Sequence, residues 1–384
     1  MRIKADWLQS SGPIAVFTLL EHAGYKVYFV GGCVRNTLLN KPFTDIDLAT
    51  SALPETVMKL AENSDLRAIP TGIEHGTITF VIDGQTVEVT TFRKDVQTDG
   101  RRAVVSFSTS IEDDAQRRDF TMNALYADLD GTIFDPLGGL DDLQAGRVRF
   151  IENPTDRIRE DYLRILRFFR FHALYGNPET GIDAEALDAC AQNLDGIDSL
   201  SKERIGHEMR KLLAAENPAP SIAAMVQTGV MHRVIVGTDP NSIAPLVHLE
   251  NTANLSPDWM RRLLALGGQG VKNALRLSKH EAQLLTEMHT VVSEAYPPRI
   301  AAYKLGLEAG RDATLVLCAH LGTPLPADLQ KELTVGAKAK FPIAAIDLGD
   351  GFSGPELGAE LKRLEKAWVD SGLRLSKGDL LALN

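Results

Sequence analysis

Hydrophobic and polar residues follow two different patterns along this 384-residue chain, and the pattern changes near residue 150. Before that point, short β-rich runs alternate with short helical segments. The expected strands lie near 27–30, 45–49, 77–82, 86–92 and 124–134, the last folded back at Asp130-Gly131. After residue 150, strand patterns almost vanish and apolar residues recur at helical spacing. We therefore expect an α+β protein, with a small mixed sheet followed by all-helical segments.

Local motifs mark several helix boundaries in the second part. Asn153-Pro154-Thr155 precedes a strong helical pattern that should end near Gly176. The Asn-Pro-Ala-Pro run over 217–220 predicts a hinge between helices. The spacing of a capping box occurs twice, at Ser278 with Glu281 and at Ser353 with Glu356. The second is followed by an apolar stripe that we interpret as core packing: Leu357, Leu361, Leu364 and Trp368.

A tight hairpin is predicted where Asp83-Gly84 joins two β-rich runs. Alternate residues of the second run share a face, with Val87, Val89 and Thr91 on one side and Thr86, Glu88 and Thr90 on the other. A carboxylate in the middle of a strand is costly if it is buried without a partner. Glu88 therefore lies either on a wet face or beside a cation.

Composition and charge narrow the class of protein only in part. No apolar run is long enough to span a membrane, and the N-terminus lacks the pattern of a secretory signal. The three cysteines (33, 190 and 318) are far apart and the histidines are scattered, so we expect a cytoplasmic protein without a zinc site. The net charge is −10, yet residues 147–170 hold seven arginines against four acids. This local excess permits binding of a polyanion.

The pair Asp45 and Asp47 follows a glycine turn, Gly31-Gly32, and Arg35. Residues two apart on a strand point to the same face, so the two carboxylates would lie roughly 6.5 Å apart at the backbone and could reach a common pair of divalent metals. Glycines let backbone N–H groups approach an anion closely. Each feature alone is more often a plain turn or a solvated strand end. Together, in this order, they favour a site for a metal-bound triphosphate, although the spacing matches neither the dinucleotide-binding motif nor the P-loop.

Two later segments carry further charged residues. A helix is expected to open at Arg117–Ala124, where Arg118 suits a phosphate and Asp119 or Asn123 suits a ribose hydroxyl. The alternative is a charged helix start with no ligand.

The second segment repeats a charged residue every three positions, at Asp161, Arg164, Arg167 and Arg170. On a helix each such step drifts by about 60°, so the four wind around half of the cylinder. They could form a solvated face of weak ion pairs. However, apolar residues surround this helix as well, and an enclosed helix makes arginines costly unless they have anionic partners.

Six motifs in this order resemble those of the bacterial class II CCA-adding tRNA nucleotidyltransferases, in the poly(A) polymerase/tRNA nucleotidyltransferase superfamily: GGCVRNTLL, DIDLAT, VEVTTFR, RRDFTMNAL, DPLGGLDDL and EDYLRILRFFRF. The resemblance is clear over 28–215 and loose beyond. It implies a nucleotidyltransferase head over 1–150, a helical neck over 151–217 and a helical body and tail over 218–384. Two residues depart from the family pattern, Asn36 where Asp is usual and Ala103 where Pro is common.

The resemblance also implies a reaction and its residues. CMP, CMP and AMP would be transferred from CTP and ATP to the tRNA 3′ end, by in-line attack of the RNA 3′-hydroxyl on the α-phosphate with two metals. Asp45 and Asp47 would bind Mg²⁺, with Glu88 as the third catalytic carboxylate. The nucleotide-binding residues would be Gly32, Arg35 and Arg118 for the triphosphate, Asp119 near the ribose, and Asp161, Arg164, Arg167 and Arg170 for the base. Apart from the resemblance, we expect tRNA phosphates to meet the neck arginines and basic residues of the tail, such as Lys362, Arg363 and Lys366.

Asp161 and Arg164 offer a physical basis for the choice of base. A carboxylate only accepts hydrogen bonds and a guanidinium only donates them. Cytosine and adenine each present an amino donor beside a ring-nitrogen acceptor, which matches this pair. Uracil and guanine present the reverse order. Our hypothesis is that this pair selects C and A without a nucleic-acid template.

Three alternatives share much of this pattern. A poly(A) polymerase usually has a basic C-terminal extension and an Arg-rich stretch where this chain has PTGIEHGTITF, and neither feature occurs. A partial enzyme adds only CC or only the final A, and the enzymes that add only CC tend to lack the mobile segment that here contains residues 99–102. A silent RNA-binding protein would have lost a metal carboxylate, whereas Asp45, Asp47 and Glu88 are all present. Some proteins of this family also carry a phosphohydrolase domain, which needs a His-Asp pair in the helical part. The chain has no His-Asp dipeptide, so we expect no such activity.

Overall fold

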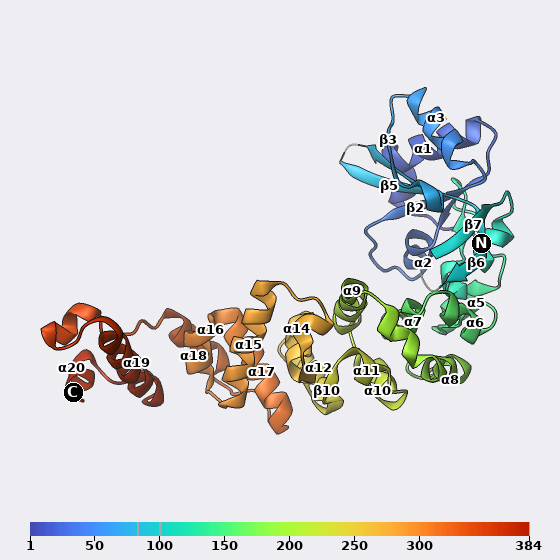
Figure 1. Cartoon of the computed structure of the whole chain (residues 1–384). Coiled ribbons are helices and arrows are strands. Elements are labelled where there is room, and N and C mark those ends of the chain that lie inside the picture. Colours follow the sequence, from blue (N-terminus) through green and yellow to red (C-terminus); the bar gives the residue numbers. More distant parts are fainter. Residues whose placement is uncertain (83, 100–101, 384) are drawn as a thin grey trace. The chain divides into compact units, whose positions relative to one another are not determined.

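The computed structural model describes residues 1–82, 84–99 and 102–383. Its contacts divide the chain into two compact units. The first comprises Met1–Arg204 with Ala224–Arg233, and the second comprises Ile205–Ala223 with Val234–Asn384. Each unit is described by itself below (Figure 1). The segment borders expected at residues 150 and 217 remain a prediction.

A seven-stranded mixed sheet is the framework of the first unit, with the strand order β3-β4-β5-β2-β1-β8-β9. Its strands are β1 Val27–Val30, β2 Ile46–Thr50, β3 Arg67–Gly72, β4 Thr77–Ile82, β5 Gln85–Thr91, β8 Tyr126–Ala127 and β9 Ile133–Phe134. β2 and β5 pair in parallel and the other neighbours are antiparallel. All five expected strand regions are confirmed. The sequence did not predict β3, because its residues are mostly exposed and include a proline.

The expected hairpin between β4 and β5 is present. Ile82 pairs with Gln85, so only two residues connect the strands. Asp83 lies outside the described residues, and Gly84 has a φ of +79°, a conformation that favours glycine. Residues 87, 89 and 91 are buried, whereas Glu88 is exposed. The face of β5 that carries Glu88 is therefore open to solvent.

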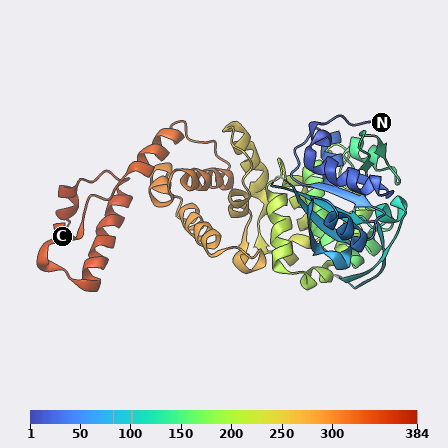
Figure 2. The same ribbon diagram turned by 90° about the horizontal axis from the view of Figure 1, so that it is seen from above.

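Helices α1 (Ser11–His22) and α3 (Pro54–Glu62) pack on this sheet. α1 contacts β1, β2 and β5, and α3 contacts β3 and β4. Figure 2 shows the same region from above (blue). The core between helix and sheet consists of side chains at most 2% exposed, among them Val16, Phe17, Leu20, Phe29 and Leu48. This packing fixes the ends of β1 and β2, where the candidate acids lie.

The expected helix at Arg117–Ala124 is wrong. A separate hairpin of β6 (Arg93–Asp99) and β7 (Arg102–Phe107), with Ala103 paired to Thr98, leads into helix α4 (Ile111–Gln116). Gly100 and Arg101, in the segment that we expected to be mobile, lie outside the described residues. After α4 the chain is irregular up to a short 3₁₀ turn, η3 (Thr121–Asn123).

A local side chain explains this ending. The Asp119 carboxylate accepts a hydrogen bond from the backbone N–H of Phe120 at 2.9 Å, which competes with helical bonding. Phe120 is extended and forms an antiparallel bridge with Phe150.

The long helix expected from Asn153 to Gly176 is also wrong, because it breaks at Asp161. Helix α6 (Pro154–Glu160) ends there, and helix α7 (Leu163–Tyr175) begins after Tyr162. Asp161 is extended (φ −152°, ψ 104°), and its carboxylate accepts a hydrogen bond from the N–H of Leu163 at 3.1 Å. A Cβ on Gly196 would lie only 1.9 Å from the Tyr162 ring, so the glycine makes room for the break. Only Arg164, Arg167 and Arg170 lie on α7.

The remaining helices, all of which except α5 lie after residue 150, confirm that the second part is helical. They are α5 Gly139–Ala145, α8 Ala184–Gln192, α9 Lys202–Leu213, α10 Ala219–Gln227, α11 Val230–Val234, α12 Ile243–Thr252, α13 Trp259–Leu266, α14 Val271–Ala274, α15 Lys279–Ser293, α16 Pro298–Leu305, α17 Leu307–Leu321, α18 Leu329–Lys338, α19 Gly354–Asp370 and α20 Lys377–Leu381. Short strands β10 (Val236–Thr238) and β11 (Gly267–Gln269) pair with each other. The predicted hinge at 217–220 overlaps the start of α10: residues 217 and 218 lie between α9 and α10, and residues 219 and 220 are the first two of α10.

One of the two expected capping boxes is confirmed. Glu281 N–H donates to Ser278 Oγ at 3.2 Å, and Ser278 N–H donates to Glu281 Oε2 at 2.7 Å. Ser353 precedes α19 without a side-chain capping bond, so the second box is wrong. The apolar stripe on α19 packs as expected, with Leu364 and Trp368 buried and two leucines half-buried in the same cluster.

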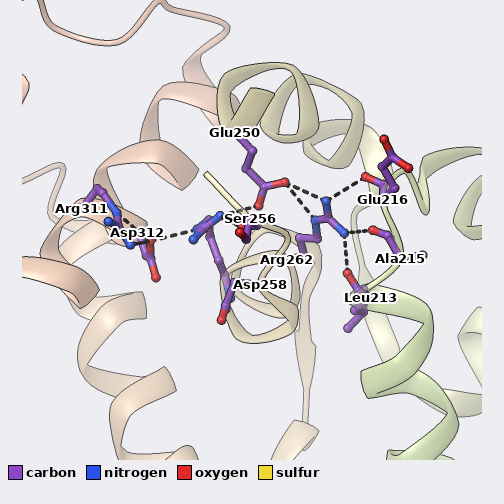
Figure 3. A network of polar contacts seen from close by, with 10 residues as sticks. Leu213, Ala215, Glu216, Glu250, Ser256, Asp258, Arg262, Arg311 and Asp312 are labelled. Atoms are coloured by element: carbon purple, nitrogen blue, oxygen red, sulfur yellow. Dashed lines mark hydrogen bonds and ion pairs between the residues drawn. The ribbon is translucent and has the colours of Figure 1, made fainter. Parts of the chain in front are cut away.

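A buried ionic network holds the second unit together around α12 and α13 (Figure 3). Glu250 and Arg262 are 2% and 1% exposed. Glu250 accepts from Arg262 Nη2 at 2.8 Å and from Arg261 Nη1 at 2.7 Å, and Arg261 also bonds Asp312 at 2.9 Å. Arg262 donates to the carbonyls of Leu213 at 2.6 Å, Glu216 at 3.0 Å, and Ala215. The network therefore closes the C-terminal end of α9.

We expect Glu250→Gln to destabilise the second unit by about 3–5 kcal/mol, because it leaves two buried guanidiniums without their shared carboxylate. The free energy of unfolding in denaturant measures the effect. Glu287→Gln, on the exposed side of α15, is the matched control and should change stability by less than about 0.5 kcal/mol. Equal effects of the two substitutions would contradict this account of the network.

Candidate active site

The candidate acids and the glycine turn lie at the same end of the neighbouring strands β1 and β2. β1 ends at Val30, whose register partner is Asp47. Gly31 follows with φ +73° and ψ −119°, and helix α2 (Gly32–Leu38) begins directly after it. Asp47 is also the register partner of Glu88 in the parallel pair β2–β5. Side chains in register on neighbouring strands point to the same face, so the two carboxylates are neighbours.

The three candidate carboxylates repel one another, as the pKa of Asp47 shows. Asp45 is exposed and accepts from the Thr44 hydroxyl at 2.9 Å, and Asp47 is half-buried. Burial raises the pKa of Asp47 to about 6, with Glu88 and then Asp45 adding to the rise and Arg118 opposing it. Within the described residues, no three Asp, Glu, His or Cys side chains are arranged as a complete metal-binding group. Adjacent, mutually repelling carboxylate oxygens are nevertheless the donors that a hard divalent cation prefers, so Asp45 and Asp47 fit such an ion.

Arg118 is held beside the glycine turn by a carboxylate that the sequence analysis missed. Asp114 on α4 is fully buried and accepts from Arg118 Nε at 3.2 Å and Nη2 at 3.0 Å, and from the Tyr126 hydroxyl at 2.8 Å. A Cβ on Gly31 would lie 3.6 Å from Arg118 Nη1. The Nε and Nη2 of Arg118 thus face Asp114, and its Nη1 faces the glycine turn. Burial alone would raise the pKa of Asp114, but Arg118 and Arg117 lower it to about 2.

Asp119 joins the irregular segment after α4 to helix α7. Its Oδ2 accepts from Arg167 Nε at 2.7 Å, and its Oδ1 accepts from Asn123 Nδ2 at 2.8 Å. Burial opposes ionisation, but Arg167 and Asn123 hold the pKa of Asp119 well below its usual range. The structure therefore brings Asp119 and Arg167 together, as their shared assignment to one site requires.

Arg35 is buried rather than open to the site. Asn36 Oδ1 accepts from Arg35 Nε at 3.0 Å and Nη2 at 2.8 Å, Asn123 accepts from Nη1, and the Tyr175 hydroxyl accepts from Nη2 at 2.8 Å. Arg35 is 7% exposed. Gly32 lies next to it, since a Cβ there would be 3.9 Å from Nη2. The role of Arg35 and Gly32 in binding a triphosphate remains a prediction.

The residues that we expect to recognise the base already have partners within the chain. Asp161 Oδ2 accepts from Arg204 Nη2 at 2.6 Å. Arg164 bonds the Glu160 carboxylate and donates to the carbonyls of Arg157 at 2.8 Å and Arg117 at 3.1 Å. The sequence analysis missed Arg204, because its partner lies 43 residues away.

Arg170, the last of the expected series, is 7% exposed, and its guanidinium lies 4.8 Å from the centroid of the Phe171 ring.

The DPLGGLDDL motif supports the segment that carries Asp119. Asp142 is 1% exposed and accepts from the Thr121 hydroxyl at 2.6 Å and from Arg149 Nε at 2.8 Å. A Cβ on Gly139 would lie 2.1 Å from the Thr121 carbonyl oxygen. The glycine thus allows α5 to approach η3, and the aspartate holds it there.

Comparisons with known proteins agree with this arrangement. The model of the poly A polymerase head domain matches residues 27–149, and that of the probable RNA and SrmB-binding site of polymerase A matches residues 181–240. The fold and the site thus define a nucleotidyltransferase of the poly(A) polymerase class. No helix among the described residues is both long and apolar enough to cross a membrane.

Relatives specify the family. CCA tRNA nucleotidyltransferase 1, mitochondrial, of Mus musculus is 32% identical over 402 residues, covering 100% of this chain and 92% of that protein. The CCA-adding enzyme of Streptococcus gordonii is 33% identical, covering 97% and 96%. The crystal structure of the Bacillus stearothermophilus CCA-adding enzyme in complex with CTP aligns with a TM-score of 0.73 at 27% identity, covering 97% of this chain and 95% of that one. The chain belongs to the family of CCA-adding tRNA nucleotidyltransferases, which confirms the resemblance drawn from its motifs.

We expect Asp114→Asn to lower stability at pH 7 by about 2 kcal/mol, because a carboxyl whose pKa falls from about 3.9 unfolded to about 2 folded stabilises the fold above pH 4. That contribution is present above the unfolded pKa and disappears as the pH falls from about 4 toward 2. Unfolding in denaturant at pH 7, 4 and 3 measures it.

The exposed Asp65→Asn is the control. Wild type and Asp65→Asn should lose stability between pH 4 and 3 more steeply than Asp114→Asn. Parallel pH profiles for all three proteins would show that Asp114 is not the ionised partner of Arg118.

Proposed function

We propose that this chain is a template-independent CCA-adding tRNA nucleotidyltransferase. It transfers CMP, CMP and AMP from CTP and ATP to the 3′ end of tRNA and releases pyrophosphate. Similarity to CCA-adding enzymes over nearly the full length of both proteins carries this proposal. The buried cysteines are all free, which is consistent with a reducing cytoplasm as the place of action.

In this proposal each part of the head has a task. Asp45 and Asp47 hold a divalent cation, Mg²⁺ in our proposal, and Glu88 adds negative charge at the neighbouring strand. When bound, the ion neutralises charge on the nucleotide phosphates and lowers the pKa of the attacking hydroxyl. Gly32 and Arg118 bind the triphosphate from the turn, with Arg35 beneath them, and Asp119 orients the ribose. The RNA 3′-hydroxyl attacks the α-phosphorus in line, and pyrophosphate leaves.

The neck selects the base in this proposal. Asp161 and Arg164 would exchange their partners within the chain for the amino group and ring nitrogen of cytosine or adenine. Arg167 and Arg170 complete this face of α7. The tail residues Lys362 and Lys366 are exposed and, with Arg363, are our proposed phosphate contacts for tRNA.

The main test is incorporation of labelled nucleotide into tRNA that lacks its 3′ end, with Mg²⁺, resolved on a sequencing gel. We expect two added C residues, one A and then arrest. We expect Asp47→Asn to lower the rate at least about 100-fold, because it removes a charged metal ligand. Asp65→Asn, away from the acids, should match wild type.

A different product would change the proposal. A long A ladder would indicate a poly(A) polymerase, and arrest after CC would indicate a partial enzyme. Binding of tRNA without any addition would favour a silent RNA-binding protein. An Asp47→Asn protein as fast as wild type would contradict the assigned metal site.

We expect Asp161→Ala to reduce the preference for CTP over UTP by about 5- to 150-fold, because a mispaired polar group costs about 1–3 kcal/mol. Single-nucleotide addition with each triphosphate alone measures this preference. Arg159→Ala, on α6 beside the site, is a control for changes in neck charge. Undiminished discrimination in Asp161→Ala would contradict the hypothesis of base selection.

A further inference from the structure

The guanidinium of Arg35 is buried, yet its hydrogen-bond partners are all neutral. They are the side chains of Asn36, Asn123 and Tyr175. Among the described residues, no carboxylate forms an ion pair with Arg35. At position 36 the family resemblance leads us to expect Asp, which would have supplied such a charge. The charge of Asp119 acts on Arg35 without a direct bond. A buried cation that no carboxylate bonds directly depends strongly on each of its hydrogen bonds.

Tyr175 gives Arg35 two kinds of support. Its hydroxyl accepts from Arg35 Nη2 at 2.8 Å and donates to Asn36 Oδ1 at 3.2 Å. Its ring centroid lies 4.3 Å from Arg35 Cζ, within the range of a cation–π contact. Tyr175 is the last residue of α7, 140 residues away from Arg35 in the chain. The pair therefore ties α2 directly to the end of α7.

A second route joins the same two elements. Arg35 Nη1 donates to Asn123 Oδ1, Asn123 Nδ2 donates to Asp119 at 2.8 Å, and Asp119 accepts from Arg167 at 2.7 Å. Arg167 lies about two turns before Tyr175 on α7.

The Phe171 ring lies between these two residues of α7. Its centroid is 5.1 Å from Arg35 Cζ and 5.4 Å from Arg167 Cζ. A closed circuit of contacts thus links α2, the Asp119–Asn123 segment and α7.

We propose that Tyr175 is a positioning residue for the nucleotide. By holding Arg35 under Gly32, it fixes the distance between the phosphate-binding turn and the base-recognising side chains of α7. A nucleotide held at both ends is sensitive to that distance, so its affinity and the choice of base depend on a hydroxyl that does not touch it. This inference rests on the proposed function.

The test compares Tyr175→Phe with Tyr28→Phe in the full chain. Tyr175→Phe keeps the ring and removes both hydroxyl bonds. Tyr28 is a half-buried tyrosine of β1 that packs against three aromatic rings, and its hydroxyl makes no hydrogen bond in the described structure. KM and kcat for CTP are measured on tRNA lacking its CCA end, together with the preference for CTP over UTP. The dissociation constant of CTP and the melting temperature are measured without tRNA.

For Tyr175→Phe we expect KM and the dissociation constant of CTP to rise about tenfold, with kcat changed by less than about threefold. The preference for CTP over UTP should fall in Tyr175→Phe. Tyr28→Phe should change neither the CTP affinity nor this preference. A lower melting temperature with unchanged CTP affinity and preference would make Tyr175 merely structural and overturn the inference. If wild type binds CTP but adds no nucleotide, the proposed function fails. The ratio of the CTP dissociation constants of Tyr175→Phe and wild type then still decides whether Tyr175 positions the nucleotide.

Discussion

The ion pair between Asp119 and Arg167 is the interaction on which the rest of the candidate site depends. Asp119 is buried, and the cost of removing its charge from water is offset only by excellent partners. Asp119 has such partners because helix α4 ends at Gln116, before Asp119, and the Asp119 carboxylate then points toward Arg167 on α7. The same carboxylate orders Asn123, and Asn123 in turn holds Arg35. One buried charge thus sets the conformation of a loop, a helix contact and an arginine beneath the glycine turn.

The charges of the site fall into two groups with opposite behaviour. Asp114 and Asp119 lie against guanidiniums, and both have lowered pKa values. Asp47 has a raised pKa, because burial and neighbouring carboxylates disfavour its charge. The first group is satisfied by the protein and acts as a frame. Within the protein, Arg118 is the charge that opposes the raised pKa of Asp47. A divalent cation bound at β2, as we propose, would stabilise the charged form of Asp47 further.

The sequence predicted those features that depend on neighbouring residues. Strand alternation located five regions of the sheet, and Asp45 and Asp47 stood out because two residues on one strand share a face. It did not reveal Arg204 or Tyr175 as parts of the site, because their roles arise from contacts with residues distant in the chain. Asp114 was missed although its partner Arg118 lies only four residues further along the chain. The break at Asp161 was missed for another reason. Helical periodicity continues through it, whereas the aspartate side chain bonds the N–H of Leu163 and Gly196 leaves space for the Tyr162 ring.

The partners of Asp161 and Arg164 bear on how a base could be selected. Both side chains are already hydrogen-bonded, to Arg204 and to Glu160, so an incoming base exchanges bonds rather than adding them. An exchange yields little net free energy when the base matches, and it costs the full value of each lost bond when the base does not. Pairing within the chain also keeps two partly buried charges from standing alone before the nucleotide arrives. A neck built in this way would discriminate mainly by rejecting mismatched bases, with the triphosphate supplying most of the affinity.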